Sequence, residues 1–394
     1  MRGAITVFMC VSFGVAAFSG ALALDRNVNG QRNDAAQLVR VESIRTNLVK
    51  ADANATNAFL VGGLEPVAAR AAYTAGISAA ARSLAESAGA NRADALVLQR
   101  VNQVVATYTG LIESARANNR QGFPVGAAYL RQASKVMQEQ VLPALDSLVT
   151  GARNRVDDAS HSLALTVVAI VTAATIVMLL VLQVWISRRT HRVFNLGLVA
   201  ATALVVIVGV ATVVGMSVSR SAAKNVRIGA FARTVALATA RSDGFDAKSA
   251  EALTLVNRGS GQAYEDRFVT VSGAASAALQ NGAAAVIPEP AVTRAQTEFA
   301  QYLTDHAEVR RLDGGGEWEK AVAVATGGGA ANQSFGRFEQ ASGQAIERQA
   351  SLVADDLDSA RSLLVPLAWL ALLAGLVAAA ATARGVNQRL REYR

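Results

Sequence analysis

Four long uncharged stretches, separated by polar sequence, dominate the pattern of hydrophobic and polar positions along this chain. They run over residues 3–24, 160–187, 193–219 and 362–383, and none contains Asp, Glu, Lys or Arg. Each has about 20 residues or more, so as a helix it can cross the roughly 30 Å hydrocarbon core of a bilayer. The pattern predicts four transmembrane helices, with one large polar segment inside each pair, at 25–159 and 220–361.

The first stretch also has one feature of a cleavable signal peptide, because Ala21-Leu22-Ala23 resembles a signal-peptidase site. Its apolar run is longer than a usual signal-peptide core, and the repeat described below includes it. We therefore expect it to be retained as the first span.

The two polar segments have the composition and periodicity of helical bundles. They are rich in good helix formers, and apolar residues recur every three or four positions, as at Val97, Val101, Tyr108 and Ile112. Clusters of Gly, Pro and Asn divide each segment into about four helices. The predicted breaks are 62–66, 88–91 and 118–124 in the first segment, and 254–261, 281–290 and 313–316 in the second.

Two of these helices are expected to continue into the membrane as long rods. One covers Asp25–Phe59 and extends the first span, and the other covers Ala128–Ile186 and enters the second, with Pro143 or Thr150-Gly151 as a place where it can kink. The fold class predicted is an all-α membrane protein with two up-down four-helix bundles.

The chain repeats its layout at an offset of about 191 residues. Asp52 falls on Asp243, Tyr73 on Tyr264, and the break at 122–124 on the break at 313–315. Both halves read span, polar segment, span in the same orientation, so the sequence predicts a tandem, parallel duplication. The two bundles are expected to pack against each other.

Charge predicts the topology. The N-terminus, the hairpin 188–192 and the tail 384–394 together have eight Lys and Arg against one Glu, whereas 25–159 has a net charge of +3 and 220–361 of −2. Short loops rich in Arg and Lys stay cytoplasmic. We expect a multi-pass protein of the cell membrane with both termini inside, both bundles outside, and basic patches that contact anionic lipid. The net charge of +8 then gives no indication of nucleic-acid binding.

Composition argues against an enzyme. The single cysteine, Cys10, lies in the first span, so the chain has no pair for a disulfide, and its three histidines are far apart in sequence. No nucleotide-binding, hydrolase or kinase motif is present. We expect no catalytic residue, no metal site and no cofactor. Transport is disfavoured as well, because the spans have no charged groups, and their glycines are expected to serve close helix packing.

Two polar clusters are candidate sites for a ligand or partner. The first is on the helix after the first span: Asn47, Asp52, Asn54 and Asn57. Asn is unfavourable in mid-helix, which suggests a use, and the alternative is an ordinary solvated face. The second precedes the break at 122: Arg116, Asn118, Asn119 and Arg120. Two Arg and two Asn suit a carboxylate, and the alternative is an ordinary helix C-terminus.

The runs ADANATNAFLVGGLEP (51–66), ARANNRQGFPVGAAYLRQAS (115–134), RRTHRVFNLGL (188–198) and VNQRLREYR (386–394) resemble an actinobacterial family of four-span membrane proteins, the GlnX-like proteins. The resemblance implies a role between an amino-acid-binding lipoprotein, GlnH, outside and the Ser/Thr kinase PknG inside. It implies that aspartate or glutamate is the stimulus.

Three hypotheses follow. The first is a sensor that relays extracytoplasmic amino-acid status to a cytoplasmic kinase; the second is a non-switching scaffold for cell-envelope partners; the third is a transport-associated subunit. With only about twenty residues inside, a sensor must act through a separate effector. The candidate coupling residues are Arg188, Arg189, Arg192, Arg389, Arg391, Tyr393 and Arg394. The alternative for these basic patches is a topology anchor.

Overall fold

The computed structural model describes residues 2–61, 65–120, 125–158, 163–190, 195–283 and 289–391, and every regular element among them is helical. The chain divides into two units. The membrane unit comprises Met1–Asn33, Val156–Arg227 and Val353–Arg394, and the bundle unit comprises Asp34–Arg155 and Ile228–Leu352. The prediction of an all-α membrane protein is confirmed, since four of the described helices are long and apolar enough to span a bilayer.

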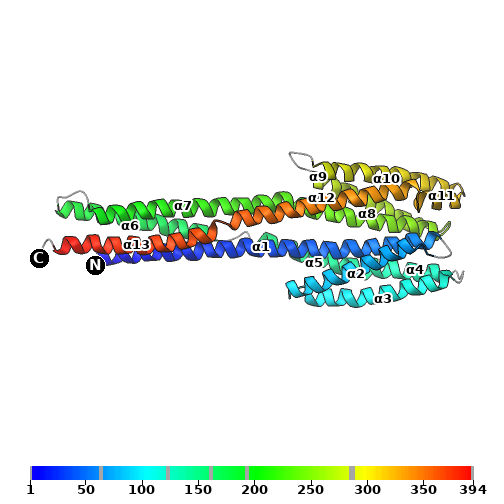
Figure 1. Ribbon diagram of the computed structural model, residues 1–394, viewed down its shortest axis with the longest axis horizontal. Coiled ribbons are helices and arrows are strands. Elements are labelled where there is room, and N and C mark those ends of the chain that lie inside the picture. The colour runs from blue at the N-terminus through cyan, green and yellow to red at the C-terminus, as the bar shows by residue number, and fades with distance from the viewer. Residues whose placement is uncertain are drawn as a thin grey trace. The chain divides into compact units, whose positions relative to one another are not determined.

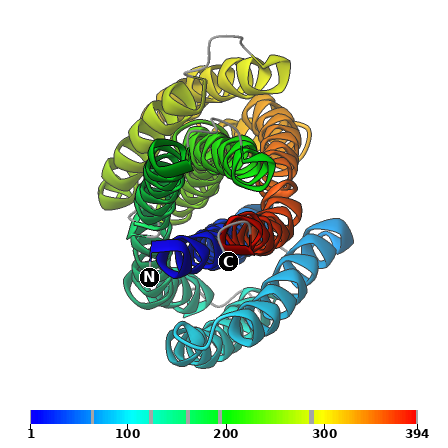
Figure 2. The same cartoon turned by 90° about the vertical axis from the view of Figure 1, so that its left-hand side faces the viewer.

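The membrane unit is formed by the first part of α1 (Arg2–Val61) together with α6 (Ala164–Thr190), α7 (Leu196–Val226) and α13 (Leu364–Arg391). Figures 1 and 2 show α13 beside α1. Gly14 and Gly375 make this approach possible, because a Cβ on Gly375 would lie 2.6 Å from the Cα of Gly14. Small residues in the spans do serve close helix packing.

Side-chain hydrogen bonds also join the helices of this unit. Gln183 Nε2 of α6 donates to Thr202 Oγ1 of α7 at 2.7 Å. Asn195, the N-cap of α7, donates to the carbonyl of Gly385 in α13 at 2.9 Å. Buried polar groups in apolar surroundings need such partners.

Bundle 1 contains the second part of α1 with α2 (Val67–Ala90), α3 (Ala95–Arg120), α4 (Val125–Val136), the π-helical turn η1 (Met137–Val141) and α5 (Leu142–Asp158). Because α4, η1 and α5 form one helical column, this is a four-helix arrangement. Helices end at the predicted breaks: α2 at Ala90 and α3 at Arg120. Residues 62–64 and 121–124, which belong to the predicted breaks at 62–66 and 118–124, lie outside the described residues.

The prediction of one continuous helix over 128–186 is wrong, because α5 ends at Asp158 and α6 begins at Ala164. A π-helical turn, η1, precedes Pro143, and there the Leu142 N–H bonds to the carbonyl of Met137, five residues back. Proline has no N–H to donate, and a wider turn adjusts the backbone around it. The helix then passes through Gly151 and ends at Asp158, and α6 begins only at Ala164.

Bundle 2 contains α8 (Ala232–Val256), α9 (Gln262–Ala283), α10 (Pro290–Gly314), the short α11 (Trp318–Ala325) and α12 (Ala330–Arg361). A second π-helical turn, η2 (Arg227–Phe231), joins α7 to α8 without a break. The turn after α10 uses Gly316 at φ +80°, a conformation that L side chains rarely adopt. Within the bundle unit, Figure 1 shows α1 between α2–α5 on one side and α8–α12 on the other.

Candidate functional site

Asp52 of α1 is the central polar group of the bundle unit. Its side chain is buried, and its carboxylate accepts hydrogen bonds from Tyr108 at 3.1 Å, from Ser134 at 3.0 Å and from Ser249 at 2.6 Å. Tyr108 is on α3 and Ser134 on α4, both in bundle 1, whereas Ser249 is on α8 in bundle 2. One carboxylate therefore ties four helices and both bundles together.

Burial dominates the electrostatics of this group. It raises the pKa of Asp52 to about 6, although the hydroxyl donors of Ser249, Ser134 and Tyr108 lower it; the nearby Asp246 raises it further. Hydroxyl donors compensate a buried carboxylate less completely than a cation would, so the charged form stays expensive. Asp52 is thus a titratable link between the bundles.

Further polar contacts of α1 with bundle 2 surround Asp52. Arg45 pairs with Asp243 of α8 at 3.1 Å, and Lys50 pairs with Glu339 of α12. Asn57 donates to Asn332 of α12 at 3.4 Å. Ion pairs and side-chain hydrogen bonds between two helices fix their register, because a shift would leave charges unpaired. The packing of α1 against α8 and α12 brings these partners together.

A cavity of about 280 Å³ lies beside this contact, between α1, α8 and α12. We call it the interface cavity. Its polar lining includes Glu42, Asn47 and Lys50 of α1 and Arg241 of α8. Asn47 donates to Ser43 at 3.3 Å, one helical turn earlier. This is a concave surface that can hold a small molecule in contact with both bundles.

Glu42 is the unusual group in this lining. The residue is 2 % exposed, and its Oε2 has no hydrogen-bond partner among the described residues. Burial raises the pKa of Glu42 to about 7, opposed by Arg45 and Arg153 and reinforced by Asp146 and Asp243. A buried carboxylate with a free acceptor is available to bind a donor.

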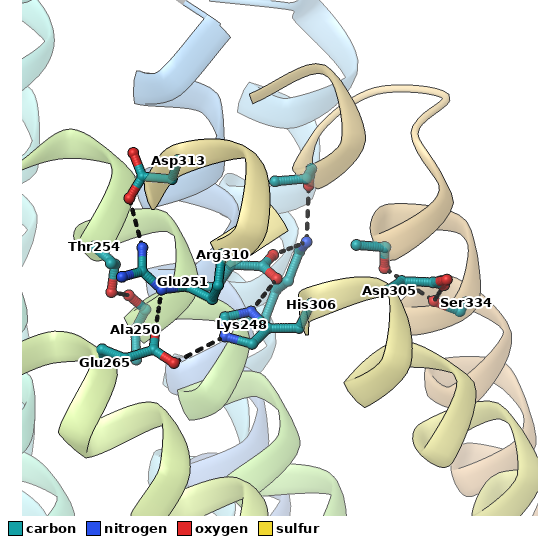
Figure 3. A network of polar contacts seen from close by, with 12 residues as sticks. Lys248, Ala250, Glu251, Thr254, Glu265, Asp305, His306, Arg310, Asp313 and Ser334 are labelled. Carbon is teal, nitrogen blue, oxygen red and sulfur yellow. Dashed lines mark hydrogen bonds and ion pairs between the residues drawn. The ribbon is translucent and has the colours of Figure 1, made fainter. Parts of the chain in front are cut away.

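Bundle 2 has its own buried charge network, drawn in Figure 3. Lys248 and Glu251 pair at 2.5 Å on α8, and His306 Nδ1 of α10 lies 2.8 Å from Glu251. His306 Nε2 lies 3.3 Å from Glu265 of α9, which also pairs with Arg310 at 3.0 Å. This network locks α8, α9 and α10 together.

Two carboxylates favour the charged form of the imidazole in this network. Burial lowers the pKa of His306, but hydrogen bonds to Glu251 and Glu265 outweigh it and raise the pKa above its usual value. Among the described residues, no group of three His, Cys, Asp or Glu side chains is placed to hold a metal ion.

The predicted polar cluster on α1 divides between different environments. Asn47 lines the interface cavity, Asp52 is buried, and Asn57 reaches α12. Asn54 is half-buried, and its Nδ2 has no hydrogen-bond partner among the described residues. None of the four is exposed, so the solvated-face alternative does not describe them.

The second predicted cluster lies at the end of α3. Arg116 is mostly buried, pairs with Glu65 at 2.9 Å and Glu113 at 2.6 Å, and stacks over Tyr73. Asn118 donates to the carbonyl of Ser114 at 2.9 Å within the last turn, as the helix C-terminus interpretation predicts.

Asn119 and Arg120 line a smaller cavity of about 90 Å³ together with Arg116. The four residues of this cluster therefore serve three purposes: an ion-pair network, a helix end and a cavity wall.

The candidate coupling residues fall at the edges of the described chain. Arg188 is exposed near the end of α6. Arg192, Tyr393 and Arg394 lie outside the described residues, and so do the side chains of Arg189, Arg389 and Arg391. Their coupling role stays a prediction.

Sequence reasoning missed most of the residues that form the polar contacts between α1 and the other helices. Ser134 and Ser249 carry no motif, and Glu42, Lys50 and Arg241 resemble ordinary surface charges in the sequence. One usable signal was in α8, where Asp243, Lys248 and Glu251 occur among Ala, Gly and Ser. A helix with small residues on every side can be surrounded by other helices, and its charges are then buried.

Comparison with known proteins gives a match to a family model. Residues 27–161, about a third of the chain, match the family model of an actinobacterial sensor domain. No curated protein and no solved structure gives a significant match. The matched segment is bundle 1, including the part of α1 that holds Asp52. It supports a sensor-type protein.

Proposed function

We propose that this chain is a multi-pass sensor of the cytoplasmic membrane that relays extracytoplasmic amino-acid status to a cytoplasmic Ser/Thr kinase. Aspartate or glutamate is the stimulus, presented by a solute-binding lipoprotein. The observation that carries the proposal is α1, a helix that runs unbroken from Arg2 to Val61. Its first part belongs to the membrane unit and its second part holds the polar contacts between the bundles.

The relay works through the packing of α1. Docking of the lipoprotein favours one of two arrangements of α1 against α8 and α12, which differ by a shift of about 1–2 Å. Such a shift travels along α1, because its backbone hydrogen bonds keep the helix rigid along its axis. The stimulus changes the balance only as far as the lipoprotein binds the two arrangements with different affinity.

Charge supports the orientation in this proposal. The short basic parts of the chain, including Arg188 and the tail from Arg384, stay on the cytoplasmic side with both termini, and the bundles are outside. The chain performs no catalytic step of its own. Its basic hairpin and tail contact the kinase and anionic lipid.

The proposal includes a tandem duplication. Bundle 1 and bundle 2 have corresponding long helices, with α11 as an addition in the second. Asp52 and Asp243, the pair matched by the offset of 191, both contact the opposite bundle, through Ser249 and Arg45. A duplicated chain supplies both halves of a dimer-like sensor from one polypeptide.

The test uses the full chain purified in detergent with candidate binding lipoproteins, with and without aspartate and glutamate. We expect a complex by size-exclusion chromatography that depends on the amino acid. In cells, Arg45→Met should keep the complex but abolish the kinase response, because it breaks the contact with Asp243. Arg337→Met, which breaks an exposed pair with Glu298, is the matched control.

Two outcomes count against this function. A complex that forms equally without amino acid, and no kinase response, supports the scaffold hypothesis instead. A kinase response that survives Arg45→Met as well as Arg337→Met refutes the route through α1.

A further inference from the structure

The interface cavity contains a buried carboxylate that lacks a partner, Glu42. We infer that the cavity binds a small organic ammonium ion, whose charged group meets Glu42 and whose aliphatic part lies along the apolar wall. The inference goes beyond the sensor function proposed above, because it gives the chain a ligand of its own.

Glu42 has no contact that satisfies its carboxylate. The residue is 2 % exposed and lines the cavity, and its Oε2 is buried. Within the part of the chain that the structure describes, Glu42 makes no hydrogen bond and no ion pair. A carboxylate removed from water needs a hydrogen-bond donor or a cation, and here it has to come from outside the protein.

The charges that act most strongly on Glu42 cancel one another. Arg45 and Arg153 favour its ionised form, and Asp146 and Asp243 oppose it. Arg45 already meets both of these carboxylates, at 3.6 Å and 3.1 Å. Arg153 is exposed, and solvent and salt screen an exposed charge. The negative charge of Glu42 is therefore left without compensation.

The other charged groups of the lining are balanced. Lys50 and Arg241 both pair with Glu339 of α12. Glu347 lines the cavity as well and acts on Arg241. Two cations thus meet two carboxylates, and nothing at this part of the lining calls for a ligand anion. The ligand that fits has one positive charge and no negative charge.

Neutral acceptors beside Glu42 match the geometry of an ammonium group. The hydroxyl of Thr46, one helical turn after Glu42, lines the cavity and makes no hydrogen bond with any described residue. Asn47 donates from Nδ2 to Ser43 at 3.3 Å, which leaves its amide oxygen able to accept a bond. An ammonium group has three donors and no acceptor. Glu42, Thr46 and Asn47 can therefore receive all three.

The apolar part of the lining calls for an organic ion. Leu38, Val235 and Ile346 form apolar wall, along which an aliphatic chain can lie. The cavity holds about 280 Å³, far more than the roughly 10–15 Å³ that one water molecule needs. An inorganic monovalent cation would leave most of this volume unfilled.

The mouth of the cavity is polar and accessible. Ser43 of α1 and Glu347 of α12 belong to the lining and are exposed, so solvent reaches the cavity there. A carboxylate at an entrance raises the local concentration of cations. A short amine can therefore enter without unfolding either bundle.

Isothermal titration calorimetry on the full chain in detergent at pH 8 tests the inference. The probe is butylammonium, with 1-butanol as its neutral analogue, butyrate as an anion of similar size, and potassium chloride as the inorganic cation. We expect butylammonium to bind at least about tenfold more tightly than each of the others, because it alone supplies both the charge and the aliphatic chain. Equal binding of all four, or no binding of butylammonium, overturns the inference.

The affinity should also depend on pH. Burial raises the pKa of Glu42 to about 7, and a cation favours the ionised form, so binding releases a proton. We expect butylammonium to bind about tenfold more tightly at pH 8 than at pH 6. Asp243, with its pKa raised to about 6, titrates in the same range, so the comparison with Glu42→Gln isolates the contribution of Glu42.

Variants assign the binding to this cavity. Glu42→Gln keeps the size of the side chain and removes its charge, so it should weaken butylammonium binding about tenfold at pH 8 and abolish most of its pH dependence. Glu86→Gln, at an exposed position of α2, is the matched control and should bind like wild type. Unchanged affinity in Glu42→Gln, with thermal unfolding like wild type, overturns the inference.

A second variant keeps the test decisive if Glu42→Gln does not fold. Thr46→Val keeps the shape of the side chain and removes its hydroxyl, so it should weaken butylammonium binding about fivefold. Wild-type affinity in Thr46→Val, together with equal binding to the wild-type chain at pH 6 and pH 8, also overturns the inference.

This inference and the proposed function fail in different ways. If butylammonium does not bind but the lipoprotein complex forms with amino acid, the cavity inference falls and the sensor function stands. If butylammonium binds and no lipoprotein complex or kinase response exists, the site stands and the lipoprotein route falls.

Discussion

Asp52→Asn is the substitution whose effect the structure defines most closely. Burial raises the pKa of Asp52 from 3.8 to about 6. Each pKa unit corresponds to about 1.36 kcal/mol, so ionising this carboxyl group costs the native state about 3 kcal/mol relative to the unfolded chain. The stability that protonated Asp52 contributes is fully present below pH 3.8 and is lost as pH rises through about 6.

The assay compares thermal unfolding of wild type and Asp52→Asn in detergent at pH 5 and pH 7.5. At pH 5, one unit below the native pKa, about 1.4 kcal/mol of this contribution remains, and at pH 7.5 almost none does. A unit of roughly 250 residues shifts its Tm by about 2–4 °C per kcal/mol. We therefore expect the Tm of wild type to fall about 3–6 °C more than that of the variant.

Asp52→Asn should change the free energy of unfolding at neutral pH less than it changes the pH dependence of that free energy. At neutral pH the amide avoids the buried charge but loses part of the hydrogen bonding of a carboxylate, which is worth about 1.5–3 kcal/mol. Asp266→Asn, at an exposed position of α9, is the matched control and should follow wild type. Identical pH dependence of wild type and Asp52→Asn would refute the reasoning that burial controls this group.

Three further predictions concern other parts of the molecule. His306→Gln should destabilise bundle 2 by about 3 kcal/mol at pH 6, because it breaks buried ion pairs. Since the pKa of His306 is raised, the stability lost in the variant should become smaller above that pKa. Thermal unfolding at pH 6 and pH 9 measures this difference. Gly375→Leu should reduce the yield of monodisperse protein in detergent, because any side chain there meets the backbone of Gly14; normal yield would contradict the close crossing. Gly273→Ala on α9, where a Cβ meets nothing within 4 Å, should raise stability by about 1 kcal/mol in chemical denaturation, and a loss would argue against an open helical position.

Much of the fold was predictable because it depends on local chemistry. The four spans follow from long uncharged sequence, and α10 begins at Pro290, where proline is favourable in the first turn. The helix break after Asp158 was missed, since no glycine or proline marks it. The π-helical turn η2 was missed as well, and the structure gives no physical account of why it forms there.

The candidate site was predictable only in part. Asp52 could be singled out because it lies among several Asn residues, which are unfavourable in mid-helix, but its partner Ser249 is 197 residues away. Hydrophobic periodicity shows which face of a helix is buried and does not show which helix covers it. The pairing of Lys50 with Glu339 depends on the register between bundles, which is a property of tertiary packing.

The long sequence separation at Asp52 has a consequence for synthesis. A ribosome that adds about 5–20 residues per second needs on the order of 10–40 seconds to pass from Asp52 to Ser249, 197 residues later. During that interval Arg45, Lys50 and Asp52 have been synthesised, but their partners in bundle 2 have not. Of the three hydroxyl donors to Asp52, those of Tyr108 and Ser134 are already synthesised and can bind it early, whereas Ser249 is not. Bundle 1 can therefore fold first and provide the surface on which α8 and α12 later pack.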